Sequence, residues 1–264
     1  MLCDDTRILL LIKDEEDTQM LQNNLHKLYK WADRNKMRFN ANKFELLRYR
    51  NEQEIKFATT YKSFNDSNID NKEQVRDLGI MMSSTATFTL HIRNILKKGR
   101  DKMGWVLRMF QSRQRSLMLT LLKSLVIPLP EYRCQIWNPW KAKDIQAIEA
   151  IQRTFTSNIT EVRHLNYWER LHELKLYSLQ RRRECYIIIS IWKITQHMLP
   201  NIDGTMGHKI KTRKHPKHGT QCVIQYPTNG NPPQSLQENA ITVLLPRLYN
   251  SLPKYLRDIE SVKT

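Results

Sequence analysis

The feature of the sequence that most constrains the fold is a long apolar stripe between residues 88 and 110. Its members recur at steps of three and four, which is the spacing of one face of an α-helix, and they are Phe88, Ile92, Ile95, Gly99, Met103, Val106 and Phe110. The stripe therefore predicts a helix of about six turns that packs one side against a core.

From about Ser84 onward the sequence predicts further helices rather than strands. Leucines between residues 117 and 125 predict a second helix, which Pro128 and Pro130 end because proline cannot continue the hydrogen-bond ladder. Isoleucines and a phenylalanine at helical spacing predict a third helix over residues 145–159. This part of the chain is therefore predicted to be mainly α-helical.

Two start signals predict the helices that follow. Asn166 with Glu169 has the capping-box pattern of a short helix, and Ser178 can open a longer one. The next segment, residues 204–237, contains five Lys or Arg, four Pro and no acidic residue. It is predicted to be a basic loop with at most one strand, near Val223.

The first third of the chain has the pattern of short strands around one helix. Leucines at helical spacing predict the helix over residues 15–35, with Asp14 or Asp17 as its N-terminal cap. The predicted strands are a buried apolar run at Ile8–Ile12, a strand, turn and strand over 37–50, and single strands over 55–62 and 75–82. The fold class predicted for the whole chain is therefore α+β.

The charge of the chain limits its partners. Its 264 residues include 43 Lys and Arg against 26 Asp and Glu, a formal charge of +17. Such an excess predicts a polyanionic partner, because each phosphate that a cation neutralises releases counterions. Charge alone leaves nucleic acid and an anionic membrane surface both open.

Apolar runs and cysteines bear on where the protein resides. The longest apolar runs have about five residues, as at Ile8–Ile12, whereas a membrane helix needs roughly 20. No transmembrane span is therefore predicted. The four cysteines form no Cys-x-x-Cys pair, which is typical of a reduced protein, nuclear or cytoplasmic.

Asp4 and Asp5 are adjacent carboxylates just ahead of an apolar run. Neighbours in a strand point to opposite faces, so adjacent carboxylates can bind one metal only from a tight turn. Polymerases present acids in this way to two Mg²⁺ ions, which hold the attacking and leaving oxygens of a phosphoryl transfer. The alternative interpretation of the pair is an acidic helix cap or a solvated turn.

Four motifs follow one another in the first third of the chain. They are Leu2-Cys3-Asp4-Asp5, a predicted helix that ends in Trp31-Ala32, Asn40 with Lys43, and Asp77-Leu78-Gly79-Ile80. In order and spacing they resemble the reverse transcriptase of non-LTR (LINE-type) retrotransposons of the jockey kind. That family has a Phe/Tyr-Ala-Asp-Asp core, of which only the two acids match. Later segments resemble its thumb and the regions beyond, over residues 121–139, 148–159, 166–189 and 246–258.

The resemblance implies an organisation and a site. Residues 1–83 would be a partial polymerase palm of short antiparallel strands plus a helix, residues 84–160 a helical thumb, and residues 161–264 a helical and basic C-terminal region. Asp4 and Asp5 would bind Mg²⁺, and Lys43 would protonate the leaving pyrophosphate, although a turn lysine that contacts phosphate or only water is the alternative. Asp77, Leu78 and Gly79 would form the primer-grip hairpin.

The implied partners are an RNA template and a DNA primer, with dNTP only in a complete polymerase and no membrane. The family's fingers and first catalytic Asp motif have no counterpart ahead of Leu2, so we expect this chain to bind template–primer but not to polymerise DNA alone. Two other interpretations remain open. In the first, the chain is a non-enzymatic module: a basic nucleic-acid-binding protein or an inert relic of the retroelement. In the second, the gene model is truncated and the real product is a full polymerase.

Basic residues are the second group of candidate site residues. Residues 91–115 contain eight Lys or Arg against one Asp, and the helical pattern places several of them away from the apolar stripe. A run Arg181-Arg182-Arg183 follows, whose arginines could equally pair with Glu184 or Glu173. The residues predicted to contact nucleic acid are Arg93, Lys97, Lys98, Arg100, Arg113, Arg115, Arg181 and Arg182.

Two residue types are not assigned to a site. Metal-binding side chains occur in the basic stretch, at His208, His215, His218 and Cys222. Their spacing matches no ordinary zinc finger and lysines surround them, so no zinc site is predicted. The six tryptophans are predicted to be core residues, although Trp137 and Trp140 flank a proline in a loop where a base could stack.

Overall fold

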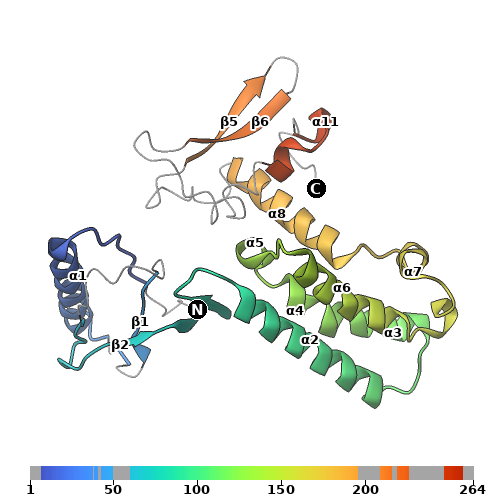
Figure 1. Cartoon of the computed structure of the whole chain (residues 1–264), viewed down its shortest axis with the longest axis horizontal. Helices are drawn as coiled ribbons and strands as arrows, with labels where there is room; N and C mark the ends of the chain where they lie inside the picture. Colours follow the sequence, from blue (N-terminus) through green and yellow to red (C-terminus); the bar gives the residue numbers. More distant parts are fainter. Residues whose placement is uncertain are drawn as a thin grey trace. The chain divides into compact units, whose positions relative to one another are not determined.

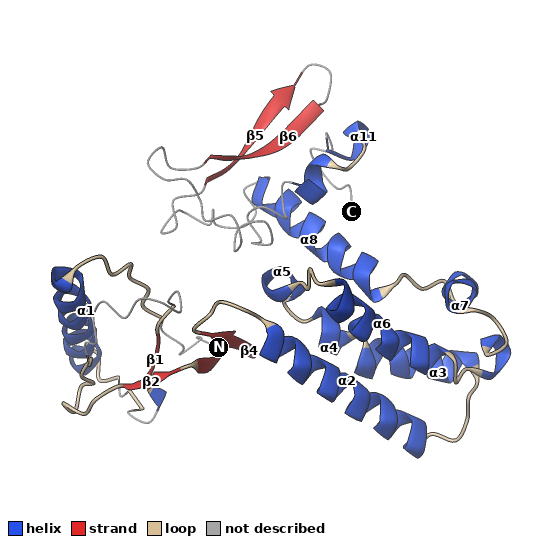
Figure 2. Ribbon diagram, in the orientation of Figure 1, coloured by secondary structure: helices blue, strands red, loops and turns tan. Residues whose placement is uncertain are grey.

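The computed structural model describes residues 7–37, 39–40, 43–49, 60–195, 209–215, 219–225 and 247–257. The chain forms two compact units, residues 1–91 and residues 92–264. Both helices and short strands are present (Figures 1 and 2), which confirms the α+β class. The first unit contains α1 (Glu15–Arg34), β1 (Glu45–Leu47), β2 (Asp70–Lys72), β3 (Gln74–Asp77), β4 (Ile80–Ser83) and the start of α2 (Thr89–Met109).

The first unit has a helix packed on an aromatic cluster. α1 begins where predicted, because the Asp14 carboxylate accepts a hydrogen bond from the Asp17 N–H at 2.9 Å. Tyr29 projects from α1 and contacts the rings of Phe39, Phe44 and Phe64 with centroids 5.8–6.0 Å apart in edge-on arrangements. Such pairs favour edge-to-face geometry, so these rings fix how α1 lies on the segments around it.

Several predicted strands of this unit are wrong. Ile8–Ile12 forms no strand, and Leu9 and Leu11 are 57% and 72% exposed, because none of the described segments pairs with this backbone. Within 37–50, only Glu45–Leu47 is a strand among the residues described, and it pairs with β2 in parallel rather than antiparallel orientation. Most of the strand predicted over 55–62 lies outside the described residues.

Residues 74–83 form a hairpin. The resemblance implied a hairpin at Asp77, Leu78 and Gly79, whereas the strand pattern alone predicted a single strand over 75–82. β3 and β4 are antiparallel, with Asp77 opposite Ile80 and Gln74 opposite Ser83. The turn between them consists of Leu78 and Gly79, whose φ angles are 44° and 87°. Two positive φ angles in a two-residue loop are the mark of a type I′ turn, whose twist matches that of the strands it joins.

The second unit is mainly helical. After α2 it contains α3 (Arg115–Leu121), the π-helix η2 (Leu122–Val126), α4 (Pro128–Glu131), α5 (Cys134–Trp137), α6 (Ala142–Thr156), the 3₁₀-helix η3 (Thr160–Val162), α7 (Tyr167–Glu173), α8 (Leu179–Thr195), β5 (Lys209–His215), β6 (Gly219–Gln225) and α11 (Lys254–Arg257). Figure 1 follows these elements from green through yellow to red.

The core of this unit matches the predicted apolar faces. Fully buried side chains come from α2, from the α3–η2 segment, from α6 and from α8, including Val106, Met118, Leu122, Ile148, Phe155 and Ile187. Pro128 does not simply end the second helix: it occupies the first turn of α4, where a missing N–H costs nothing. The last turn before it is a π-helix, in which the Ile127 N–H donates to the Leu122 carbonyl at 2.9 Å.

The end of the chain returns to α8. Tyr249 is buried against Ile187 and Ile191 of α8, and its hydroxyl donates to the Arg257 carbonyl at 2.9 Å. The predicted capping box of α7 is confirmed, since Asn166 and Glu169 exchange the two hydrogen bonds that define it. The stretch predicted to hold one strand near Val223 contains two, β5 and β6, paired antiparallel.

Candidate nucleic-acid interface

α2 carries six Lys or Arg residues against one Asp. Ile92, Ile95, Gly99 and Val106 are buried, and this side of the helix packs on the core. Four of the predicted contact residues, Arg93, Lys97, Lys98 and Arg100, are all exposed. At 100° per residue, Arg93, Lys97 and Arg100 fall within about 60° of one another, on the side of α2 turned away from most of the buried stripe, and they span about 10 Å of helix axis. We call these three residues the α2 basic face.

An exposed aromatic side chain lies farther along α2, roughly 110° around the helix from the centre of this basic face. Trp105 is 42% exposed, and the Lys102 ammonium lies 5.2 Å above its ring centroid. A cation over an indole face is a favourable pairing, and a base can stack on the same kind of ring. α2 therefore presents cations and an aromatic ring together, the two elements that a nucleic-acid strand contacts.

Arg113 and Arg115, also predicted to contact nucleic acid, are held by protein groups. The Arg113 guanidinium donates to the Leu107 carbonyl at 2.6 Å and to the Phe110 carbonyl, so it closes the C-terminus of α2. Arg115 forms an ion pair with Glu173, at 3.0 Å between Nη1 and Oε1. Its backbone N–H donates to Glu161 at 3.0 Å and lowers the pKa of that carboxyl.

The three arginines at 181–183 have three different environments. Arg181 is exposed, with its guanidinium 5.1 Å above the Tyr177 ring. Arg182 pairs with Glu131 rather than with Glu184 or Glu173, and its hydrogen bond to Glu131 raises the pKa of the guanidinium. Arg183 is completely buried. Of this run, only Arg181 is therefore exposed on the surface.

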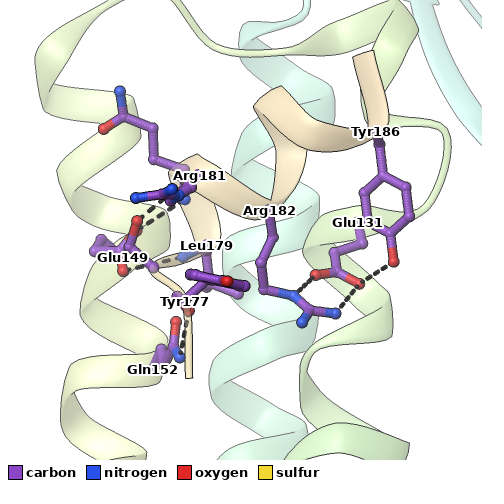
Figure 3. Close-up of polar contacts among 10 residues, drawn as sticks. Glu131, Glu149, Gln152, Tyr177, Leu179, Arg181, Arg182 and Tyr186 are labelled. Carbon is purple, nitrogen blue, oxygen red and sulfur yellow. Dashed lines mark hydrogen bonds and ion pairs between the residues drawn. The ribbon is translucent and has the colours of Figure 1, made fainter. Parts of the chain in front are cut away.

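A buried carboxylate organises the start of α8 and had no signal in the sequence. Glu149 on α6 is 6% exposed. It accepts hydrogen bonds from the Leu179 and Gln180 N–H groups at 3.1 Å each and from the Tyr167 hydroxyl. Figure 3 shows Glu149 beside the backbone of Leu179, and Arg182 and Tyr186 converging on Glu131. A carboxylate at a helix N-terminus is stabilising, so Glu149 fixes where α8 begins.

The turn predicted as a primer grip is exposed in part. Asp77 ends β3 and forms an ion pair with Arg7. Leu78 is 37% exposed at the tip of the hairpin, beside Gly79. Lys43, the predicted general acid, is exposed, and its N–H donates to the Asn40 carbonyl at 3.0 Å.

The predicted metal ligands Asp4 and Asp5 lie outside the described residues. Within the described ranges, no three His, Cys, Asp or Glu side chains gather in a way that could hold a metal ion. Of the residues considered for zinc, His208 and His218 lie outside these ranges as well. None of the helices described is long and apolar enough to cross a membrane.

The tryptophans depart most from what the sequence predicted. Trp137 is buried, as expected of a core residue, and its Nε1 donates to the Tyr132 carbonyl at 2.8 Å. Four others are largely exposed: Trp31, Trp105, Trp140 and Trp168. Their assignment to the core is wrong, because indole is amphipathic and needs only part of its surface covered.

Comparison with known proteins identifies a relative but no family. The chain matches no protein-family model, and no solved structure matches it. An uncharacterized protein of Caenorhabditis elegans is 25% identical over 166 residues, which is 60% of this chain and 84% of that protein. That relative carries no stated activity.

Proposed function

We propose that this chain is related to the reverse transcriptases of LINE-type retrotransposons and binds template–primer nucleic acid, with the α2 basic face as its main contact surface. The observation that carries the proposal is this surface itself. Arg93, Lys97 and Arg100 are exposed on one side of α2, and the apolar stripe of this helix is buried. A rigid row of cations is what a phosphate backbone binds, since each neutralised phosphate releases condensed counterions.

The motifs around α2 support the same proposal. In the sequence, the hairpin of β3 and β4 directly precedes α2, which is the order of primer grip and thumb in the family that the chain resembles. On this view residues 1–83 correspond to part of the palm and α2 to the first helix of the thumb. Asp77, Leu78 and Gly79 would contact the primer strand, and the protein would reside where RNA and DNA meet, in the nucleus or cytoplasm.

The two acids that the resemblance assigns to metal binding belong to the same proposal, which does not include DNA synthesis by this chain alone. Asp4 and Asp5 would be the residues that hold Mg²⁺, an ion that in polymerases stabilises the charge of a phosphoryl transfer. Among the residues described, no cluster of acids adds to them. Binding of template–primer is therefore the activity that we propose for this chain. Lys43 is exposed in a turn, where its ammonium can reach a phosphate.

The test is direct binding of a labelled RNA–DNA hybrid to the full chain, followed by fluorescence anisotropy at about 50 mM salt. We expect a submicromolar Kd. The variant that carries Arg93→Gln, Lys97→Gln and Arg100→Gln should bind at least about tenfold more weakly, because three phosphate contacts are lost. Replacement of Trp105, on the same helix, by Ala should weaken binding of the hybrid as well if a base stacks on its ring.

A matched control removes the same charge elsewhere in the second unit. Lys143, Arg163 and Lys193 are all exposed and belong to segments other than α2, so their change to Gln should lower affinity only slightly through the net charge. Equal losses in the two triple variants would mean that binding depends on total charge alone. No binding of the parent chain at low salt would overturn the proposed function.

A further inference from the structure

A cavity of about 150 Å³ lies between the α5–α6 loop and the first turns of α8. Its walls come from Asn138, Pro139, Trp140, Ile145, Gln180, Arg183 and Glu184. A water molecule occupies about 30 Å³ in the liquid, so the space holds several waters or one small anion. The lining combines charged and polar side chains with apolar groups and an aromatic ring.

Arg183 is one of the lining residues, and its side chain is completely buried. Its Nε donates to the Asn138 Oδ1 at 3.2 Å. The two terminal nitrogens, Nη1 and Nη2, have no hydrogen-bond partner among the described residues. Burial lowers the pKa of the guanidinium, because a charge in low dielectric is costly. A buried guanidinium with two unpartnered donors is a site that an oxyanion would complete.

The nearby carboxylates are committed to other donors. Glu131 pairs with Arg182. Glu149 accepts from Tyr167 and from the start of α8. Glu184 accepts from the Gln180 side chain at 3.0 Å. These acids help to keep Arg183 charged from a distance, while its outer nitrogens form the fork that matches a phosphate or carboxylate.

The rim of the cavity adds an aromatic surface and a second cation. Trp140 is 62% exposed although its side chain also lines the cavity. The Lys141 ammonium lies 5.1 Å above its ring centroid. An exposed indole beside an anion site can stack a base that is attached to the bound phosphate.

We propose that this cavity binds one nucleotide, with its phosphate on the Arg183 guanidinium and its base stacked on Trp140. The inference rests on the proposed function, because it makes the cavity a second contact for a nucleic-acid strand. It goes beyond that function in assigning a phosphate site inside the helical unit, away from the α2 basic face. A free mononucleotide and the terminal nucleotide of a strand both carry the phosphate and the base that this cavity would bind.

The test is calorimetric titration of the full chain with adenosine monophosphate, adenosine and inorganic phosphate in separate experiments. We expect the monophosphate to bind more tightly than inorganic phosphate, and adenosine to bind weakly. Trp140→Ala should weaken the monophosphate about fivefold or more, because stacking is lost, and leave inorganic phosphate unchanged. Trp140 is exposed, so this variant keeps the fold.

Arg183→Gln should abolish binding of both phosphate and monophosphate, and circular dichroism checks that this variant folds. Arg183→Lys keeps the charge but not the two-pronged guanidinium, so it should retain a weak affinity for both ligands. A short oligonucleotide, tested with and without a 5′-phosphate, distinguishes a strand end from a free nucleotide as the ligand. If the phosphorylated strand binds more tightly than the monophosphate, the site is assigned to a strand end. If the monophosphate binds more tightly, the site is assigned to a free nucleotide.

The α2 triple variant separates this inference from the proposed function. It should lose RNA–DNA binding and still bind the monophosphate. Absence of monophosphate binding in a chain that binds the hybrid would overturn the nucleotide site alone. Monophosphate binding that is unchanged in Trp140→Ala would also overturn it, because the indole would then play no part.

Discussion

Gly99 of α2 lies against Ile151 of α6 so closely that a Cβ atom on Gly99 would be 2.6 Å from the Ile151 Cδ1. Both residues are buried. The contact sets how near the helix that carries the basic face approaches the core, and the absence of a side chain at residue 99 makes that approach possible.

Gly99→Ala should therefore destabilise the protein. Overpacking costs about 1–3 kcal/mol, while alanine gains about 1 kcal/mol over glycine in helix propensity. The expected net loss is up to about 2 kcal/mol, measured by chemical denaturation.

Gly104→Ala, on the same helix, is the matched control. A Cβ at residue 104 meets only the end of the Arg108 side chain, at 3.2 Å, which can move. This variant should gain up to about 1 kcal/mol. Stabilisation of similar size in both variants would contradict the close packing of α2 on α6.

Leu78→Asn should stabilise the hairpin of β3 and β4. Leu78 has a φ of 44°, and the left-handed region costs a residue with a branched or bulky side chain about 1–2 kcal/mol, whereas asparagine tolerates it. We expect a gain of about 0.5–1 kcal/mol in the free energy of unfolding. Leu78→Val should lower stability instead, because a β-branched residue is least suited to positive φ. If both variants changed the free energy of unfolding in the same direction, the positive φ angle of Leu78 in this turn would be contradicted.

Glu149→Gln should cost about 2–4 kcal/mol, because the buried carboxylate accepts from three donors and an amide offers one acceptor atom fewer. The control is Glu173→Gln, which removes only the exposed ion pair with Arg115 and should cost less than about 1 kcal/mol. Thermal or denaturant unfolding gives both values. A loss of similar size in both variants would mean that Glu149 does not anchor α8.

Cys134 and Cys185 should differ in reactivity. Burial raises the pKa of the Cys134 thiol to about 11, whereas Cys185 is exposed. Only the thiolate reacts with iodoacetamide, so at pH 8 Cys185 should be alkylated and Cys134 protected until the protein unfolds. Mass spectrometry of the digested protein resolves the two sites, and rapid labelling of Cys134 in the folded chain would refute its burial.

The same raised pKa links stability to pH. An unfolded thiol loses its proton near its ordinary value of about 9, while the folded one keeps it up to about 11. Cys134 therefore favours the unfolded state increasingly as pH rises through this window. Cys134→Ser should reduce that part of the alkaline loss of stability.

The helices of the second unit were largely predictable, because local signals decide them. The stripe of Ile92, Ile95 and Val106 is buried as its spacing predicts, and the Asn166–Glu169 capping box needs only residues three apart. The strands of the first unit were less so. A strand requires a partner, and the run at Ile8–Ile12 has none among the residues described.

The basic residues show why the site was only partly predictable. Arg181, Arg182 and Arg183 are neighbours in sequence, yet the helical turn directs them to solvent, to Glu131 and to the interior. The partners of Arg182 and Arg183 lie 51 and 45 residues away. No local pattern reveals such pairs, and Glu149 was missed for the same reason.

The salt dependence of hybrid binding tests the central claim most directly. The slope of log affinity against log salt reports the number of phosphates neutralised, at about 0.9 per contact for a duplex. We predict that the triple variant at Arg93, Lys97 and Arg100 lowers the magnitude of this slope by about two to three, while the control at Lys143, Arg163 and Lys193 leaves it unchanged. Equal slopes for the parent chain and the α2 variant would contradict the assignment of α2 as the nucleic-acid interface.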